Sequence, residues 1–299
     1  MPTSIAFVFP GQGSQYVGMG RKVAERYTEE CIYEKADAMV DYDLLELMWN
    51  GPEEKLGQTR YTQPAIFVDS VSKSQVLKSL GIFPDFVLGH SLGEYSALVA
   101  AEVLDFGSAM GLVELRAKLM DENDVEGGMS AVLGLGYEEV QSVLEQVEEP
   151  PRIANYNSPT QIVISGSQSS LSRARSALEE NRAKVIDLDV SGPFHTRWVK
   201  GAEEQLSHHI SEITFSDPSV PVLSGVSGEL ETSGEKLKKL LRRQITSPVL
   251  WVNYLRRLAE RGVDRTVEVG PGEVLQGLCR RIDSNMEHYT FEEVIEDEF

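Results

Sequence analysis

The stretch DFVLGHSLGEYSALVA, residues 85–100, predicts the central unit of the fold. A short apolar strand from Asp85 to Leu88 leads into the pentapeptide Gly89-His90-Ser91-Leu92-Gly93, and a helix is expected from Leu92 to Val103. A GxSxG sequence between a strand and a helix is typical of a sharp, strained turn that lifts the serine hydroxyl clear of the backbone. Amide donors at the helix N-terminus favour a developing oxyanion. We therefore predict that Ser91 is a nucleophile, in preference to a plain strand-to-helix turn.

Other short apolar runs alternate with helical stretches on both sides of this unit. Strands are predicted at Ser4 to Phe9, Val220 to Leu223 and Arg265 to Val269. Strands separated by helices indicate a mostly parallel sheet that is covered by helices on both faces. The predicted fold class is therefore α/β.

The order of predicted strands and helices in the segment 127–193 differs from that in the rest of the chain. Strand, helix, strand, strand, helix and strand are predicted in turn at Ser130–Leu135, Tyr137–Val147, Ile153–Tyr156, Gln161–Ser165, Leu171–Asn181 and Lys184–Val190. The two middle strands flank an expected turn at Asn157-Ser158-Pro159. This βαββαβ order is the ferredoxin-like pattern. We expect residues 127–193 to form a small subdomain inserted into a large α/β subdomain of residues 1–126 and 194–299.

Composition excludes several classes of protein. The chain has 28 Lys and Arg against 47 Asp and Glu, a formal net charge of −19, which argues against nucleic-acid binding because phosphate contacts need dense Lys and Arg. No apolar run approaches the ~20 residues of a membrane span, and the N-terminus lacks the basic start of a secretory signal. Cys31 and Cys279 have no metal-ligand spacing, so we expect no structural metal, no disulfide and a cytoplasmic location.

Charge is unevenly distributed along the chain. Acidic residues concentrate in the segment Asp121 to Glu126 and in a C-terminal tail that begins near Glu287. One basic run stands against this background, formed by Lys236, Lys238, Lys239, Arg242 and Arg243. It is either the solvated face of a helix or a docking surface for an acidic partner.

A nucleophilic serine needs a general base, and histidine is the usual one. We favour His195 among the five histidines, because it follows the rigid turn Ser191-Gly192-Pro193-Phe194, where a cleft between the subdomains is expected. His90 adjoins the nucleophile and is expected to pack or to line the pocket. The remaining three are expected at exposed or tail positions: His208, His209 and His288.

Arg116 is the one cation expected on the buried face of its helix, which is predicted over Ser108 to Met120. Its neighbours three and four positions away are all apolar: Leu112, Val113, Leu119 and Met120. A buried arginine must find an anion or bear a large desolvation cost. That anion is either a structural carboxylate of the chain or the carboxylate of a substrate such as a malonyl group.

The loop Gly11-Gln12-Gly13-Ser14-Gln15 follows the first predicted strand. A glycine-rich loop in this position can bind phosphate, but this one lacks the spacing of a P-loop or of a dinucleotide fingerprint. Its backbone amides could instead complete an oxyanion hole with the amide of Leu92.

These segments together resemble the malonyl-coenzyme A:acyl carrier protein transacylase family, and the resemblance runs through most of the chain. It also rests on further matches in the same order: Thr62-Gln63-Pro64-Ala65, Glu94-Tyr95, Asn155-Tyr156-Asn157-Ser158-Pro159, Gly192-Pro193-Phe194-His195, Arg243-Gln244 and Glu268-Val269-Gly270-Pro271-Gly272. The fold of that family, a hydrolase-like α/β core with a mostly parallel sheet and a ferredoxin-like insertion, agrees with the pattern of strands and helices above.

The resemblance implies roles for individual residues. Ser91 would form an acyl-serine ester and His195 would be its base, oriented by a backbone carbonyl at the place that Gln244 matches. The remaining implied roles are the amides of Gln12 and Leu92 for the oxyanion, Arg116 for the malonyl carboxylate, and Gln63 for the acyl pocket. The expected reaction is ping-pong transfer of malonyl from malonyl-coenzyme A to the phosphopantetheine thiol of an acyl carrier protein. The family also implies a monomer that uses no metal or redox cofactor.

Selectivity and pathway follow less directly. Leu92 and Phe194 resemble the malonyl-selective pattern. A bulky Phe194 would crowd an α-methyl branch and disfavour the methylmalonyl group by about 1–3 kcal/mol. Arg197-Trp198 after the histidine is similar to discrete acyltransferases that serve polyketide synthases in trans, so fatty-acid and polyketide pathways both stay open. An editing acyl hydrolase, a generic esterase and a carrier-binding scaffold without turnover are the rival functions. Arg116 argues against the first two, and the presence of Ser91, His195 and Arg116 together argues against the third.

Overall fold

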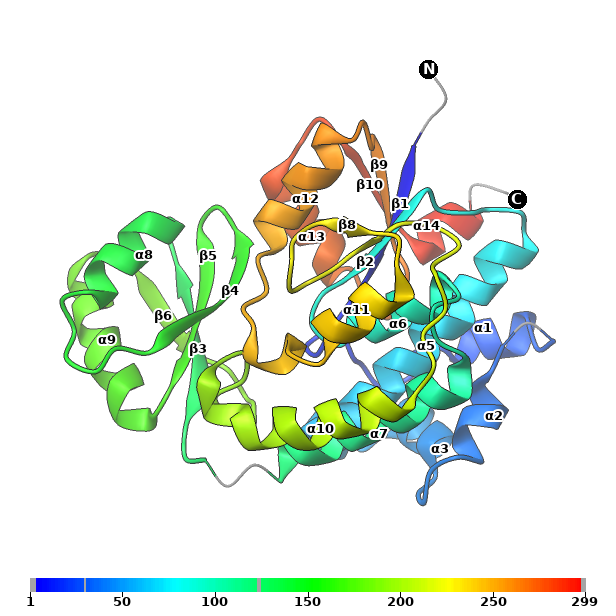
Figure 1. Ribbon diagram of the computed structural model, residues 1–299, viewed down its shortest axis with the longest axis horizontal. Helices are drawn as coiled ribbons and strands as arrows, with labels where there is room; N and C mark the ends of the chain where they lie inside the picture. The colour runs from blue at the N-terminus through cyan, green and yellow to red at the C-terminus, as the bar shows by residue number, and fades with distance from the viewer. Residues whose placement is uncertain (1–3, 30, 123–124, 297–299) are drawn as a thin grey trace.

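Two separate β-sheets organise the computed structural model, which describes residues 4–29, 31–122 and 125–296 (Figure 1). The larger sheet has the strand order β10-β9-β1-β2-β7-β8, and every pair is parallel except the antiparallel edge pair β7 and β8. Its strands are β1 (Ile5–Phe9), β2 (Phe86–Gly89), β7 (Val222–Leu223), β8 (Leu230–Glu231), β9 (Arg265–Glu268) and β10 (Glu287–Thr290).

Strand β1 lies in the middle of this sheet and is apolar on both faces, as a strand covered by helices on each side must be. Phe7 and Phe9 pack on one side against the helices α5 (Thr59–Ser79), α6 (Gly93–Ala100) and α7 (Phe106–Asp121). Ala6 and Val8 pack on the other side against α12 (Trp251–Glu260) and α13 (Val274–Ile282). The last residue of β1 pairs with Gly89 at the end of β2. The loops that follow these two strands therefore leave the sheet side by side, at its carboxyl edge.

Helices surround this sheet. They are α1 (Arg21–Arg26), α2 (Tyr33–Asp37), α3 (Leu44–Asn50), α4 (Glu53–Gly57), α5 (Thr59–Ser79), α6 (Gly93–Ala100), α7 (Phe106–Asp121), α10 (Lys200–Glu212), α11 (Gly234–Leu241), α12 (Trp251–Glu260), α13 (Val274–Ile282) and α14 (Phe291–Glu296), with the 3-10 helices η1 (Arg197–Val199) and η2 (Gln244–Thr246). Within the described ranges, none of the helices has both the length and the hydropathy to cross a membrane.

The smaller sheet is fully antiparallel, with the order β4-β5-β3-β6. Its elements are β3 (Gly128–Leu133), α8 (Tyr137–Leu144), β4 (Arg152–Ser158), β5 (Gln161–Gly166), α9 (Gln168–Glu180) and β6 (Lys184–Asp187). The two helices pack together on one face around a core of their own. The α/β fold class is confirmed, with a mostly parallel sheet and a separate antiparallel βαββαβ unit that stands to the left in Figure 1.

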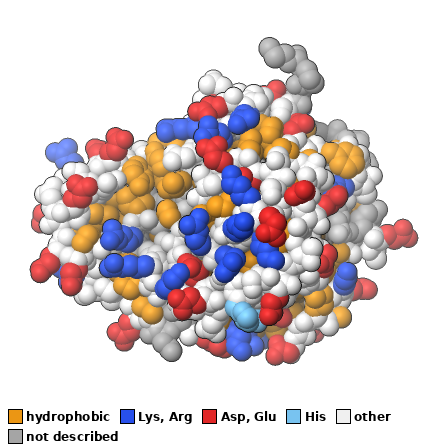
Figure 2. All heavy atoms as spheres, viewed as in Figure 1, with side chains coloured by type: hydrophobic (Ala, Val, Ile, Leu, Met, Phe, Trp, Pro, Cys, Tyr) orange, Lys and Arg blue, Asp and Glu red, His pale blue; other side chains and the backbone are white. Residues whose placement is uncertain are grey.

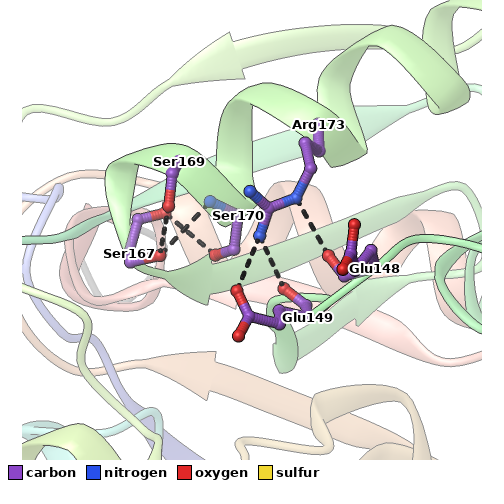
Figure 3. A network of polar contacts seen from close by, with 6 residues as sticks. All are labelled: Glu148, Glu149, Ser167, Ser169, Ser170 and Arg173. Carbon is purple, nitrogen blue, oxygen red and sulfur yellow. Dashed lines mark hydrogen bonds and ion pairs between the residues drawn. The ribbon is translucent and has the colours of Figure 1, made fainter.

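Polar contacts fix the start of α9 within this smaller unit (Figure 3). Ser167 caps the helix, because its hydroxyl accepts a hydrogen bond from the amide of Ser170 at 3.2 Å. One turn later, Arg173 donates from Nε to the carbonyl of Glu148 at 2.9 Å and also pairs with the carboxylate of Glu149. Helix α9 is thereby tied to the segment that follows α8.

The C-terminal segment is the main difference from the predicted elements. Residues expected as an acidic tail form the parallel edge strand β10 and the helix α14 instead. Their carboxylates have partners: Glu287 pairs with Arg265 at 2.6 Å, and Glu292 reaches the buried Lys73 at 2.8 Å. His288 is buried and lies next to Thr266 of β9 at 2.7 Å. The acidic residues Asp297, Glu298 and Asp124 lie outside the described residues.

Backbone hydrogen bonds join the two units along β4. The amide of Tyr156 donates to the carbonyl of Val249 at 2.8 Å, and the amide of Val249 donates back to the carbonyl of Ala154 at 2.8 Å. The segment before α12 thus extends the small sheet as a short parallel bridge. The antiparallel sheet is therefore anchored directly to the chain that passes the carboxyl edge of the large sheet.

Candidate active site

Ser91 lies at the sharp turn between β2 and α6 and has a φ of 52°. This left-handed conformation is strained for a residue other than glycine, and such strain is concentrated at functional sites. The two flanking glycines are required by close backbone contact. A Cβ on Gly89 would lie 1.9 Å from the carbonyl carbon of Gly93, and a Cβ on Gly93 would lie 2.0 Å from the carbonyl oxygen of Phe9. The turn is therefore pressed against the end of β1.

His195 meets this serine from the loop before η1. Its Nε2 lies 2.8 Å from Ser91 Oγ, and its Nδ1 lies 2.9 Å from the carbonyl oxygen of Ser247. A carbonyl can only accept, so Nδ1 carries the proton and Nε2 is left as the acceptor for the serine hydroxyl. His195 has the tautomer of a general base without any carboxylate behind it.

Burial, and to a smaller extent the nearby positive charge of Arg116, lower the pKa of His195 to about 3. Hydrogen bonding of the ring to the carbonyl of Ser247 opposes this effect but is smaller. The imidazole is therefore neutral at neutral pH, as a base that accepts the proton of a serine must be. Protonation of His195 is costly while the charge of Arg116 has no counterion.

Arg116 points from the buried face of α7 to the same serine. Its Nη2 donates to Ser91 Oγ at 2.9 Å, and its Nη1 donates to Gln63 Oε1 at 2.6 Å. Gln244 Oε1 accepts a longer bond from Nη2 at 3.4 Å. His195 and Arg116 thus both contact the hydroxyl oxygen of Ser91.

The buried guanidinium has only neutral acceptors. Arg116 is 1% exposed, and within the described residues it forms no ion pair, while its Nε has no partner. The carboxyl group that acts on its pKa is that of Glu94, and burial raises the pKa of that carboxyl to about 7. Burial also lowers the pKa of Arg116 itself. Among the described residues, no carboxylate pairs with Arg116, so of the two alternatives left by the sequence this site is suited to a bound anion.

A cavity of about 140 Å³ opens in front of these groups between the two sheets. It is lined by Gln12, His90, Ser91, Leu92, Arg116, Met120, Met129, Asn155, Asn157, Val163, Leu188, Val190, Phe194 and His195. Within the described residues, the backbone amides of Gln12 and Leu92 donate to no protein acceptor. These amides are therefore available as the predicted pair of oxyanion donors.

Two glutamines lie behind the arginine and do not line the cavity. Gln63, expected in the acyl pocket, accepts from Arg116 and donates from Nε2 to Met120 Sδ at 3.4 Å. Gln244 donates from Nε2 to the carbonyl of Ser91 at 2.5 Å. The backbone carbonyl at 2.9 Å from His195 Nδ1 is that of Ser247. The backbone of Gln244, the position that the family resemblance indicated, is a weaker hydrogen-bond partner that also raises the pKa of His195. Both glutamine side chains therefore orient Arg116 and the serine turn.

Asn155 and Asn157 are site residues that the sequence reasoning missed. The sequence predicts a turn at Asn157, but β4 continues to Ser158, where it pairs with Gln161. Asn157 Oδ1 consequently lies 2.9 Å from His90 Nε2, which confirms that His90 packs beside the pocket. The alternation Asn-Tyr-Asn with a period of two was the available signal for a strand with both amides on one face.

Similarity to known proteins covers nearly the whole chain. A family model described as "Acyl transferase domain" matches residues 6–292. The chain belongs to this acyltransferase family. The acyltransferase is 42% identical over 287 residues to the malonyl CoA-acyl carrier protein transacylase of Escherichia coli (strain K12), with 94% of this chain and 93% of the relative covered. It is 39% identical over 291 residues to that of Bacillus subtilis (strain 168), with 95% and 92% covered.

Solved structures agree with the fold of this acyltransferase. An acyl carrier protein S-malonyltransferase from Vibrio cholerae matches with a TM-score of 0.92 and 39% identity, covering 96% of each chain. A malonyl-transacylase in complex with a type II polyketide synthase acyl carrier protein matches with a TM-score of 0.90 and 39% identity, covering 96% of this chain and 95% of that one. The resemblance to the malonyl-coenzyme A:acyl carrier protein transacylase family is confirmed.

Metal-ligating side chains are not clustered in this site. Across the described residues, no group of three or more His, Cys, Asp or Glu side chains is arranged to hold a metal ion.

Proposed function

We propose that this acyltransferase moves a malonyl group from malonyl-coenzyme A to the phosphopantetheine thiol of an acyl carrier protein through a malonyl ester of Ser91. The observation that carries the proposal is the position of Ser91 Oγ, 2.8 Å from His195 Nε2 and 2.9 Å from Arg116 Nη2. A nucleophile, its base and a receptor for a carboxylate meet at this atom. An acyl group that carries its own carboxylate fits the site best.

In the loading step, Ser91 Oγ attacks the thioester carbonyl carbon while its proton passes to His195 Nε2. The carbonyl oxygen becomes an oxyanion, for which the amides of Gln12 and Leu92 are the available donors. The C–S bond then breaks, and the coenzyme A sulfur leaves with the proton from the imidazolium. The carrier thiol reverses these steps, giving its proton to His195 and releasing Ser91.

The carboxylate of the substrate has a second role in this proposal. In the free protein, the charge of Arg116 is one of the causes that lower the pKa of His195. A malonyl carboxylate bound to the guanidinium would neutralise that charge and make the imidazolium less costly to form. An acetyl group would leave the charge in place. Arg116 would therefore select malonyl through the proton-transfer step as well as through binding.

Intact-protein mass after brief mixing with malonyl-coenzyme A tests the proposal. We expect a malonyl adduct on the native protein, no adduct on Ser91→Ala, and transfer of the adduct to added holo carrier protein. Release of malonate to water faster than transfer to the carrier would support the hydrolase instead. Complete absence of an adduct with carboxylated acyl thioesters would support a scaffold without turnover.

The proposal also covers cofactors, cellular location, oligomeric state and pathway. The route needs no metal or redox cofactor, because Ser91 and His195 supply bond formation and proton transfer, and coenzyme A enters as part of the substrate. We place the enzyme in the cytoplasm as a monomer. Cys279, which is buried and forms no disulfide among the described residues, is consistent with a reducing compartment. Size-exclusion chromatography with light scattering tests the monomer. Fatty-acid and polyketide carriers share this chemistry, so competition between the two in the transfer assay decides the pathway.

A further inference from the structure

We propose that a basic groove between α10 and α11 docks an acidic face of the acyl carrier protein. The groove has a volume of about 540 Å³. Its cations are Lys200 at the start of α10 and Lys239, Arg242 and Arg243 around the end of α11. This inference rests on the proposed function, because it names the surface that would receive the acceptor of the second half-reaction.

The basic run of the sequence separates into two sets in the structure. Lys236 pairs with Glu231 at 2.8 Å, a carboxylate whose side chain is only 4% exposed. Lys238 donates from Nζ to the carbonyl of Ile213 at 2.7 Å and lies over the ring of Phe215. These two lysines hold α11 against its neighbours, so they are structural and are not part of the groove.

The second set consists of Lys239, Arg242 and Arg243, which are exposed and form no ion pair with any described residue. Lys239 and Arg243 are exposed, and their side chains have no hydrogen-bond or ion-pair partner among the described residues. Arg242 donates from Nε to the hydroxyl of Ser207 at 2.7 Å, which is a neutral partner. A protein with a net charge of −19 keeps these three cations together without neutralising them. Such cations attract an acidic protein surface and accelerate encounter with it.

Figures 1 and 2 show where this cluster lies on the surface. Lys and Arg side chains gather over the middle of the face drawn in Figure 2, where α11 lies in Figure 1. Acidic side chains lie around the rim of the same face, and a few lie beside the central cations. The contrast of charge within one face would orient an acidic partner toward α11.

The groove is linked to the catalytic site by the chain and by hydrogen bonds. Arg243 directly precedes Gln244, whose side chain contacts both Arg116 and the carbonyl of Ser91. On the other wall, Lys200 binds Glu203, and Glu203 in turn accepts a hydrogen bond from Thr246 of η2. A partner held by α10 and α11 would therefore lie beside the segment that positions Ser91 and His195.

The same cations could in principle hold the phosphates of coenzyme A, but the form of the groove favours a protein. Lys239, Arg242 and Arg243 are all exposed and line an open groove of about 540 Å³. Long, exposed cations along two helices suit the separated carboxylates of an acidic helical surface.

Charge reversal tests the docking surface in each half-reaction separately. The variant Lys239→Glu/Arg243→Glu is compared with Lys22→Glu/Arg261→Glu, which changes the net charge equally at exposed positions outside the groove. Loading is followed by intact mass with malonyl-coenzyme A, and transfer from the loaded protein is followed at increasing concentrations of holo carrier. Pantetheine serves as a small acceptor without a protein surface. Thermal unfolding of both variants accompanies the kinetics.

We expect the groove variant to raise the KM for carrier by about tenfold or more at low salt, with loading and transfer to pantetheine changed less than twofold. Added salt should weaken carrier binding in the native protein and have little effect in the variant. An unchanged KM for carrier, or an equal increase in the control variant, would overturn the docking surface. A loss of loading in the groove variant alone would assign the groove to coenzyme A. Failure of the native protein to form an adduct would instead contradict the proposed function.

Discussion

Arg116 Nη2 donates a hydrogen bond of 2.9 Å to Ser91 Oγ, so the group that fits the substrate carboxylate also contacts the attacking atom. The serine oxygen has two lone pairs, and this bond occupies one of them while the hydroxyl proton faces His195. A carboxylate that binds the guanidinium competes for the same donor. Binding of malonyl would therefore release the nucleophile and supply the counterion of Arg116 in one event.

Replacing this arginine should change the preferred acyl group. In Arg116→Ala we expect kcat/KM for malonyl-coenzyme A to fall by about 10²–10³, as for the loss of a buried charge-assisted pair of about 3–4 kcal/mol. Acetyl transfer should rise relative to malonyl transfer, because no unneutralised charge then opposes protonation of His195. Rates of loading with both thioesters check this. Equal losses for malonyl and acetyl would show that Arg116 has only a structural role.

The conservative variant Arg116→Lys separates charge from geometry. The ammonium of lysine keeps the positive charge. It lacks the planar guanidinium, whose two terminal nitrogens donate to Gln63 and Ser91 at the same time. We expect malonyl loading to be only partly restored relative to Arg116→Ala. Full restoration would mean that charge alone selects the substrate.

The acid limit of loading should lie unusually low. Burial and the charge of Arg116 lower the pKa of His195 to about 3, so the base stays neutral as the pH falls below 6.5. We expect kcat/KM for malonyl-coenzyme A to show no loss with an apparent pKa near 6.5 when the pH is lowered from 8 to 5. In Arg116→Ala the pKa of His195 should rise, since a positive neighbour is removed, and the acid limb should move upward. A native acid limb at 6.5 would contradict this account of the base.

Close backbone packing around the serine turn gives a prediction on stability. Gly93→Ala would place a Cβ 2.0 Å from the carbonyl oxygen of Phe9, a backbone atom that cannot move without shifting β1. We expect a loss of about 3 kcal/mol or more in the free energy of unfolding, together with loss of loading. The matched control is Gly111→Ala in α7, where no atom lies within 4 Å of the added Cβ. That change should stabilise the protein by about 0.5–1 kcal/mol.

A buried ion pair in α5 should be important for stability alone. Lys73 lies 3.1 Å from Asp69 Oδ2, with side chains 1% and 0% exposed, and donates to the carbonyl of Gly270 at 2.8 Å. Lys73→Met should lower the free energy of unfolding by about 3–5 kcal/mol, because Asp69 is left buried and unpaired. Adding Asp69→Asn should recover part of the loss, since the amide is neutral and still accepts from Tyr33. Urea unfolding of the single and double variants measures both effects.

The parts of the site that the sequence predicted are those with a local signal. Ser91 was indicated by its pentapeptide between a strand and a helix, and Arg116 by apolar neighbours at helical spacing. The structure brings their side chains and that of His195 together. Their catalytic roles stay predictions until the variants are measured. The α/β core and the βαββαβ unit followed from the same periodic patterns.

What the sequence did not predict depends on contacts between distant segments. The partner of His195 Nδ1 is the backbone carbonyl of Ser247, and any residue type could supply it. Strand β10 has the sequence Glu-His-Tyr-Thr, which lacks an apolar run, and it forms because β9 offers a free edge. Gln63 lies behind Arg116 because α5 and α7 pack together, which no local pattern of α5 reveals.

The backbone bridge between β4 and Val249 limits how this protein can be recombined with its relatives. Ser247, which orients the base, lies two residues before the point where the chain is hydrogen-bonded to β4. A chimera that exchanged only residues 127–193 would set a foreign strand edge against the native segment 247–249. The unit of exchange therefore has two pieces that are remote in sequence, and crossovers that keep both from one parent should preserve the base.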